Sequence, residues 1–149
     1  MEKQTTLDGT EYVEKTSDDW ETPKKLFRQL NKEFSFTLDP CCREETAKCE
    51  KYFTIETDGL KKSWKGERVF MNCPYSEISE WVKKAYIERK LGCLLTVALL
   101  PAWTDRWWFH EFIYPKKAEV RFLEGRIKFL LNGQTMKSAP FGSMVVIFK

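Results

Sequence analysis

The chain has 149 residues, which is the length of one ordinary domain. Hydrophobic residues make up 42% of it and aromatic residues 15%, so the chain can bury a core and wholesale disorder is excluded. Its 25 Lys and Arg residues only slightly outnumber its 22 Asp and Glu residues, and the charges are mixed along the chain. The resulting net charge of +3 permits a nucleic-acid partner without demanding one.

The composition also bears on membranes, secretion and metals. The longest apolar stretch, residues 91–103, is shorter than the ~20 residues of a membrane-spanning helix, and the polar N-terminus has no apolar signal region. The five cysteines, an odd number, indicate reduced thiols. They form no CxxC pair, and His110 is the only histidine. We therefore expect a cytoplasmic protein with no metal site and no membrane contact.

The chain begins with polar residues, and helical signals follow. We expect residues 1–19 to form a flexible polar arm and residues 20–149 to form a single domain. Thr22 suits the N-cap of a helix and Pro23 its first position. Apolar residues then recur at helical spacing over 26–34, which predicts a helix with one apolar face.

The remaining elements are predicted from periodicity and turn residues. Strands are expected at 34–38, 69–71, 93–100, 118–123, 126–131 and 143–148, and helices at 78–91 and 104–115. Ser76 or Ser79 suits the cap of the first of these helices, and Gly92 its end. Residues 41–63 are polar and irregular, with room for a short helix. The order predicts an α/β sheet with a parallel centre, an antiparallel C-terminal edge and helices on both faces.

Two predicted strands end in polar turns, and ligands of open α/β sheets bind at such ends. Asp39 follows the first strand, and its carboxylate suits an ammonium or a ribose hydroxyl. After the second strand, Asn72 offers an amide oxygen, Cys73 a carbonyl pinned by Pro74, and Tyr75 an aromatic face. This set suits a planar ring that carries an amine, which could then attack an electrophilic methyl group in line. Both segments are also compatible with plain turns that end strands.

Five short motifs occur in a characteristic order. They are Asp19-Trp20-Glu21-Thr22-Pro23, Leu38-Asp39-Pro40-Cys41-Cys42, Asp58-Gly59-Leu60 before Trp64, Asn72-Cys73-Pro74-Tyr75-Ser76, and Gly125-Arg126 with Phe129. Together, over residues 18–148, they resemble the compact phage and prophage Dam-type DNA adenine-N6 methyltransferases. The resemblance implies a Rossmann-like methyltransferase sheet, S-adenosylmethionine as cofactor and double-stranded DNA as partner. It also implies that the target adenine is flipped out of the duplex.

The resemblance assigns roles to residues of this chain. It implies cofactor contacts for Trp20, Thr22, Pro23, Asp39, Pro40 and Asp58, and contacts to the flipped adenine for Asn72, Cys73, Pro74 and Tyr75. The family pattern most often has proline where Cys73 stands, but only a backbone carbonyl is needed there, so we expect activity to survive. Cys41-Cys42-Arg43 replaces the family's glycine-rich loop. Glu56 is the candidate acidic partner of the ribose.

DNA contacts are expected from the later part of the chain. Trp103 with Arg106 could line the DNA groove, and Arg126 with Lys128 could touch phosphates. Core packing of Trp103 and a solvated hairpin around Arg126 are the structural alternatives. No separate recognition domain is predicted, so the loops must read the DNA sequence, for which the resemblance suggests GATC.

The predicted function is therefore transfer of a methyl group from S-adenosylmethionine to the exocyclic amine of adenine in duplex DNA. The protein would be encoded by a phage or prophage and act in the cytoplasm of the bacterial host. Two alternatives stay open. One is a methyltransferase for another planar amine or amide, such as a protein glutamine or an RNA base. The other is a catalytically idle DNA-binding relic of the fold.

Overall fold

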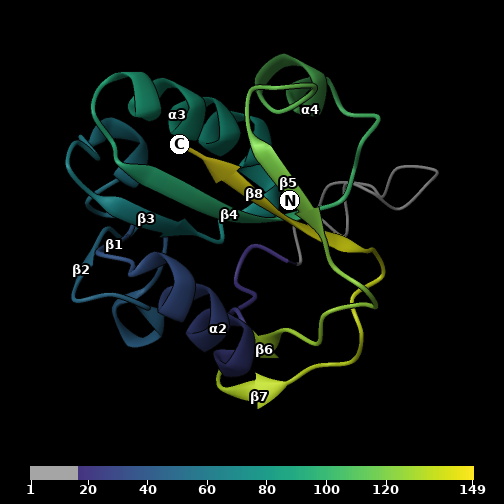
Figure 1. The fold of residues 1–149 in the computed structure, drawn as a ribbon. Coiled ribbons are helices and arrows are strands. Elements are labelled where there is room, and N and C mark those ends of the chain that lie inside the picture. The colour runs from purple at the N-terminus through teal and green to yellow at the C-terminus, as the bar shows by residue number, and fades with distance from the viewer. Residues whose placement is uncertain (1–16) are drawn as a thin grey trace, which may run out of the picture.

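Six strands form one sheet in the part of the chain that the computed structural model describes, residues 17–149 (Figure 1). Their order is β2 (Lys51–Tyr52), β1 (Leu38–Asp39), β3 (Arg68–Met71), β4 (Leu95–Pro101), β8 (Ser143–Phe148) and β5 (Glu119–Phe122). The strands β2, β1, β3 and β4 pair in parallel, and β8 pairs antiparallel with both β4 and β5. The predicted parallel centre and antiparallel C-terminal edge are confirmed. Most of the predicted arm, residues 1–16, lies outside the described residues.

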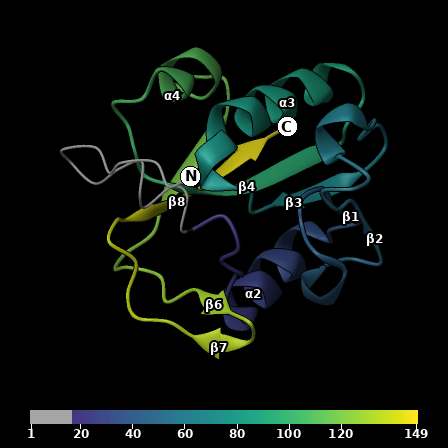
Figure 2. The same ribbon diagram turned by 180° about the vertical axis from the view of Figure 1, so that it is seen from behind.

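Helices cover both faces of this sheet, as predicted. Figures 1 and 2 show α3 (Ile78–Lys90) and α4 (Trp107–Phe112) on one face and α2 (Lys24–Phe34) on the other. A small hairpin of β6 (Leu130–Leu131) and β7 (Gln134–Thr135) lies beside α2. Within residues 17–149, none of the helices has the length and apolar character needed to cross a bilayer.

The core is centred on β4 and β8. Every residue of both strands is buried. Successive side chains of a strand point to opposite faces, so an unbroken apolar run is stable only where both faces are covered. The apolar run at residues 93–100 therefore predicts a central strand from the sequence alone. This prediction is confirmed by β4 (Leu95–Pro101).

Several predicted boundaries are wrong. Phe34 is the last residue of α2, and Ser35 then adopts a left-handed conformation with φ of 53°. The predicted strand 34–38 is consequently reduced to its end, where β1 begins at Leu38. The predicted aromatic-rich helix 104–115 is limited to α4 (Trp107–Phe112). The end of α2 is decided by one backbone conformation, that of Ser35, which periodicity does not report.

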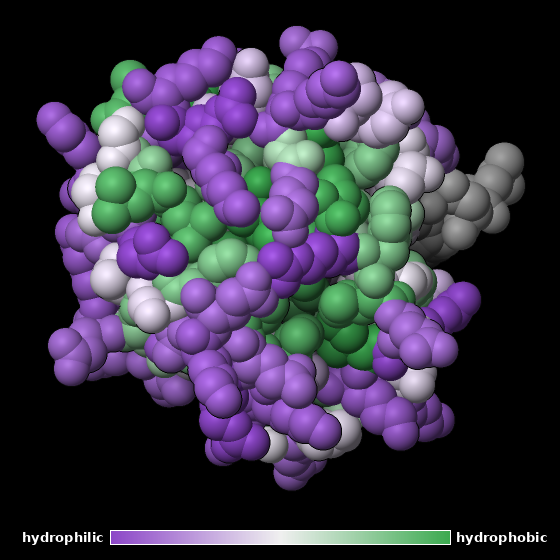
Figure 3. Space-filling model, viewed as in Figure 1, coloured by the Kyte–Doolittle hydropathy of each residue, from purple (hydrophilic) through white to green (hydrophobic). Residues whose placement is uncertain are grey.

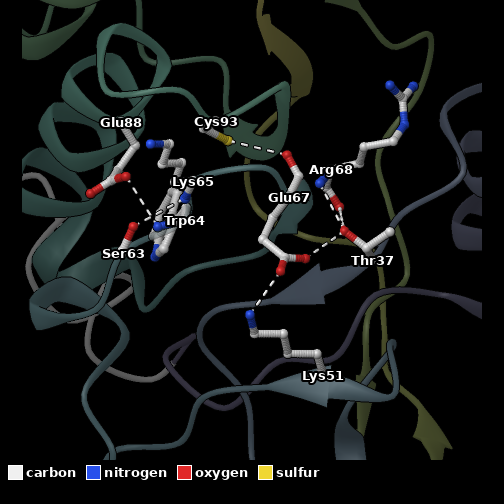
Figure 4. A network of polar contacts seen from close by, with 9 residues as sticks. All are labelled: Thr37, Lys51, Ser63, Trp64, Lys65, Glu67, Arg68, Glu88 and Cys93. Carbon is white, nitrogen blue, oxygen red and sulfur yellow. Dashed lines mark hydrogen bonds and ion pairs between the residues drawn. The ribbon is translucent and has the colours of Figure 1, made fainter.

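The strand β2 lies in the segment predicted to be irregular, and a side-chain network helps to hold it. Glu67, just before β3, accepts a hydrogen bond from Lys51 Nζ at 2.7 Å and another from Thr37 Oγ1 at 2.7 Å. Figure 4 shows this carboxylate between the two donors. Lys51 begins β2 and Thr37 precedes β1, so Glu67 ties together the starts of three parallel strands. This network lies at the amino-terminal ends of the strands, and their carboxyl ends lie at the opposite edge of the sheet.

The face seen in Figure 1 carries an ion pair over apolar side chains. Arg121 of β5 donates two hydrogen bonds to the Glu33 carboxylate of α2, at 2.7 and 2.8 Å. Apolar side chains reach the surface near the centre of this face, between β5 and β6 (Figure 3). Both partners of the pair are substantially exposed, so its contribution to stability is small.

Candidate active site

The carboxyl ends of β1 and β3 open on one cavity. The two strands are parallel neighbours, so the turns that follow them meet at the same edge of the sheet. A cavity of about 660 Å³ lies there and is lined by residues between 18 and 22, 39 and 60, and 70 and 81. Its volume lies within the range of small-molecule sites. Its position is the one expected for a ligand in an open α/β sheet.

The structure brings most of the predicted cofactor and substrate residues to this cavity. Those that line it are Trp20, Thr22, Asp39, Pro40, Asp58, Asn72 and Pro74. Pro23, Cys73 and Tyr75 are not among the described lining residues. Glu56, the candidate ribose partner, is exposed and is not among them either.

Asp39 is a buried carboxylate at the cavity wall. Its side chain is 4% exposed and accepts backbone hydrogen bonds from Lys48 N at 3.0 Å and Cys41 N at 3.4 Å. Burial raises the pKa of the Asp39 carboxyl to about 6, although both hydrogen bonds act in the opposite direction. A carboxylate whose pKa is raised by burial at the wall of a cavity is typical of a functional site.

The variant Asp39→Asn is expected to remove a pH dependence of stability. Folding raises the pKa of Asp39 from its ordinary value of 3.8 to about 6. The stability that this carboxyl contributes is therefore full below about pH 4 and is lost as the pH rises through 6. We expect the stability difference between the variant and the wild type to change in favour of the variant by about 2 kcal/mol between pH 4 and pH 8. Urea unfolding across this range measures it, and a constant difference would contradict the burial argument.

A tight loop brings Asp58 to the cavity, next to the Asp39-Pro40 turn. Asp58 has φ of 55°, and its carboxylate accepts a hydrogen bond from Leu60 N at 3.2 Å. The carbonyl of Gly59 accepts a hydrogen bond from Trp64 Nε1 at 3.0 Å. A Cβ atom on Gly59 would lie 2.0 Å from the carbonyl oxygen of Pro40, so only glycine fits. The Asp-Gly-Leu motif before Trp64 thus packs against the Asp39-Pro40 turn.

Asn72 presents a defined amide to the cavity. Its Nδ2 donates one hydrogen bond to the carbonyl of Trp20 at 3.0 Å and another to Thr22 Oγ1 at 3.1 Å. The two N–H groups are thereby used, and Oδ1 is left as the acceptor. Thr22 does not cap α2 through its side chain, because the N-cap residue is Pro23. The predicted Thr22 cap is wrong, and the hydroxyl serves Asn72 instead.

The ring of Tyr75 is enclosed by neighbouring aromatic side chains. Tyr75 is 1% exposed, and its hydroxyl donates a hydrogen bond to the Leu99 carbonyl at 3.1 Å. The ring packs edge-on against Phe129, Phe141 and Trp103, with centroids 6.0 to 6.5 Å apart. Burial raises the pKa of the Tyr75 hydroxyl well above its usual value, so the hydroxyl stays protonated.

The cavity is strongly acidic. Of the described residues that line it, seven are acidic and two, Arg43 and Lys48, are basic. The acidic ones are Asp18, Asp19, Glu21, Asp39, Asp58, Glu77 and Glu80. Burial and then the neighbouring Glu80 and Asp18 raise the pKa of Glu77, as an excess of negative charge requires. Such a cavity favours a cationic ligand.

Glu77 and Glu80 have no distinguishing signal in the sequence, because acidic residues are common at the start of a helix. Asp18 falls in the segment predicted to be an arm. In the structure its carboxylate accepts hydrogen bonds from Ser76 N at 3.0 Å and Ser76 Oγ at 2.5 Å. Neither Ser76 nor the predicted alternative Ser79 caps α3, whose N-cap residue is Glu77. Gly92 follows the end of α3 as predicted, with φ of 106°.

The predicted DNA-contacting residues lie elsewhere. The Arg106 guanidinium lies 4.5 Å from the centroid of the Trp103 ring, which also packs against Tyr75 and Phe141. Arg126 and Lys128 are exposed on the segment before β6. None of these four predicted residues is among the described residues that line the cavity. Residues 17–149 contain no group of three or more side chains arranged to hold a metal ion.

The sheet with a parallel centre, the cavity at its carboxyl edge and the Asn-x-Pro-Tyr turn in its wall define a Rossmann-like methyltransferase fold. The chain belongs to the DNA N-6-adenine-methyltransferase (Dam) family, whose model matches residues 9–149. The family resemblance seen in the motifs is confirmed.

Two relatives illustrate the similarity. The chain is 32% identical over 127 residues to a DNA N-6-adenine-methyltransferase of Escherichia phage T1, a match that covers 84% of this chain and 52% of the relative. It is 29% identical over 136 residues to a protein of the same name from Haemophilus phage HP1, covering 89% of this chain and 79% of that protein. The chain therefore spans about half the length of the phage T1 protein.

Proposed function

We propose that this protein transfers a methyl group from S-adenosylmethionine to the exocyclic N6 amine of an adenine that is flipped out of duplex DNA. The observation that carries the proposal is the oriented amide of Asn72 in the wall of the cavity at the carboxyl edge of the sheet. The family membership supports the choice of adenine in DNA. We also propose that the protein acts in the cytoplasm of a bacterial host, since both relatives are phage proteins.

The chemistry of the cavity fits S-adenosylmethionine. The cofactor carries a sulfonium, an ammonium and a carboxylate, so its net charge is positive, and the excess of acidic lining residues favours it. Residues that would hold it are Trp20, Thr22, Asp39, Pro40 and Asp58, with Pro23 supporting them from the start of α2. When bound, the cofactor supplies the electrophilic methyl group. The demethylated product has lost the sulfonium charge. The acidic residues therefore attract the product less than the cofactor, which favours product release.

The protein's own contribution is to position the amine. Asn72 Oδ1 and the carbonyl of Cys73 accept the two N6 hydrogens, which orients the nitrogen lone pair toward the methyl group. Pro74 restricts the backbone that carries this carbonyl. Tyr75 would stack on the base. Phe129, Phe141 and Trp103 pack against its ring, so one or more of these side chains must shift when the base enters.

Exposed basic residues supply the DNA contacts in this proposal. Arg126 and Lys128 would neutralise phosphates, and Trp103 with Arg106 would lie along the groove. None of these four residues is among those described as lining the acidic cavity, and the group that enters it in this proposal is the uncharged base.

Methyl transfer from labelled S-adenosylmethionine tests the proposal. Purified protein is incubated with duplex DNA, RNA or a protein extract, and nucleosides from the DNA are separated. We expect label in DNA alone, as N6-methyladenine. Label in RNA or protein would identify the alternative substrate class. Saturable cofactor binding in calorimetry without transfer to any substrate, or no binding at all, would overturn the proposed activity. Digestion of host DNA with methylation-sensitive nucleases, with and without expression, then tests whether the methylated sequence is GATC.

A further inference from the structure

We propose that Thr22 is a positioning residue that sets the orientation of the Asn72 amide. The proposal rests on the proposed function, in which Asn72 Oδ1 accepts a hydrogen bond from the target amine. It assigns to Thr22 a role beyond contact with the cofactor, because the hydroxyl acts through another side chain.

The hydrogen-bond geometry distinguishes the two possible orientations of the amide. Nδ2 lies 3.0 Å from the Trp20 carbonyl oxygen and 3.1 Å from Thr22 Oγ1. A half-turn of the amide would bring Oδ1 against that carbonyl oxygen, where both atoms are acceptors and repel each other. The carbonyl thus selects the orientation, and the Thr22 hydroxyl adds a second fixed point that defines the plane of the amide.

Burial makes the hydroxyl hard to replace. Thr22 is 1% exposed, so water has little access to take over as the acceptor of the Asn72 N–H group. Loss of the hydroxyl would leave this N–H without its partner, which carries a desolvation penalty. The amide would then be free to rotate away from the position that the target amine needs.

The two acceptors are carried by a backbone segment that is itself held in place. Glu21 lies between Trp20 and Thr22, and it exchanges backbone hydrogen bonds with Leu130 of β6 at 2.8 and 2.9 Å. Its carboxylate also accepts a hydrogen bond from Asn132 N at 2.8 Å. The acceptors therefore lie at fixed positions opposite Asn72, although 50 residues separate Thr22 from it.

The test compares Thr22→Val, which keeps the shape and removes the hydroxyl, with Thr22→Ser, which keeps the hydroxyl. We expect kcat for DNA methylation at saturating S-adenosylmethionine to fall about tenfold in Thr22→Val. We expect Thr22→Ser to restore the wild-type rate. Calorimetry with S-adenosylmethionine reports the cofactor contact of Thr22 separately, and kcat at saturating cofactor does not depend on that affinity. Thr22→Ala serves as a second hydroxyl-free variant with the same expected loss.

A second readout does not depend on activity. The side-chain amide signals of Asn72 in ¹H–¹⁵N NMR spectra are identified by their absence in Asn72→Ala. We expect them to shift and to exchange faster with water in Thr22→Val, and to match the wild type in Thr22→Ser. Unchanged signals in Thr22→Val, or weaker cofactor binding with unchanged kcat, would overturn the positioning role. If the wild type methylates no DNA, the proposed function fails, while the NMR comparison still decides how Asn72 is held.

Discussion

Replacing Asn72 with alanine is expected to lower kcat for DNA methylation by about 100- to 1,000-fold, the range found when one preorganised polar group is removed from an active site. In the proposed function Asn72 Oδ1 orients the target amine. The variant lacks this acceptor, so only the Cys73 carbonyl would remain to hold the amine. Binding of S-adenosylmethionine should persist, because the acidic residues of the cavity are unchanged. Initial rates at saturating cofactor and DNA, together with calorimetry, measure the two effects separately.

A matched control is Asn31→Ala. Asn31 is exposed on α2, where its side-chain oxygen accepts a hydrogen bond from Phe36 N at 2.9 Å. It is not among the described residues that line the cavity. Replacing Asn31 with alanine should lower the free energy of unfolding by about 1 kcal/mol and leave kcat unchanged. Equal rates for the Asn72→Ala variant and the wild type would contradict the assignment of the amide to the target base.

The variant Gly59→Ala is expected to destabilise the protein by about 3 kcal/mol. The added Cβ atom would lie 2.0 Å from the Pro40 carbonyl oxygen and 3.2 Å from the Trp81 ring. The first contact is with backbone, so the loop and the β1 turn must separate. Asp58 and Pro40 line the cavity on the two sides of this contact, and the affinity for S-adenosylmethionine should fall as well. Thermal unfolding and calorimetry measure both effects.

Gly142→Ala is the control for this prediction. A Cβ atom on Gly142 would have no heavy atom within 4 Å among those that the structure describes, so the substitution should be nearly neutral. If Gly59→Ala unfolds at the same temperature as Gly142→Ala and binds the cofactor as the wild type does, the close approach to Pro40 does not exist in solution.

The sequence predicts the sheet well where the pattern is local. The apolar run before Pro101 becomes β4, and residues 143–148 become β8 with the predicted bounds. The sequence predicts short strands poorly. β1 and β2 contain two residues each, and their pairing depends on neighbours that are distant in the chain. No periodicity can be read from two residues.

Some features of the candidate site can likewise be predicted from the sequence and others cannot. The turns after β1 and β3 are visible as Asp39-Pro40 and Asn72-x-Pro-Tyr, and both reach one cavity. The enclosure of Tyr75 is not visible, because Phe129 and Phe141 come from a segment more than fifty residues away in the chain. The acidic character of the cavity is also hidden, since the contributing residues are scattered over several segments that only the fold brings together.

By itself, the sequence determined which residue types stand at the ends of the strands, because a strand, its turn and its motif are contiguous in the chain. Only the tertiary structure decided how those residues are held. The hydrogen bond from Asn72 to Thr22, the burial that shifts the pKa of Asp39 and the contact of Gly59 with Pro40 all depend on segments that meet in space. Hydrogen bonds, desolvation and steric contact act over a few ångströms, whereas the pattern of a sequence records separation along the chain.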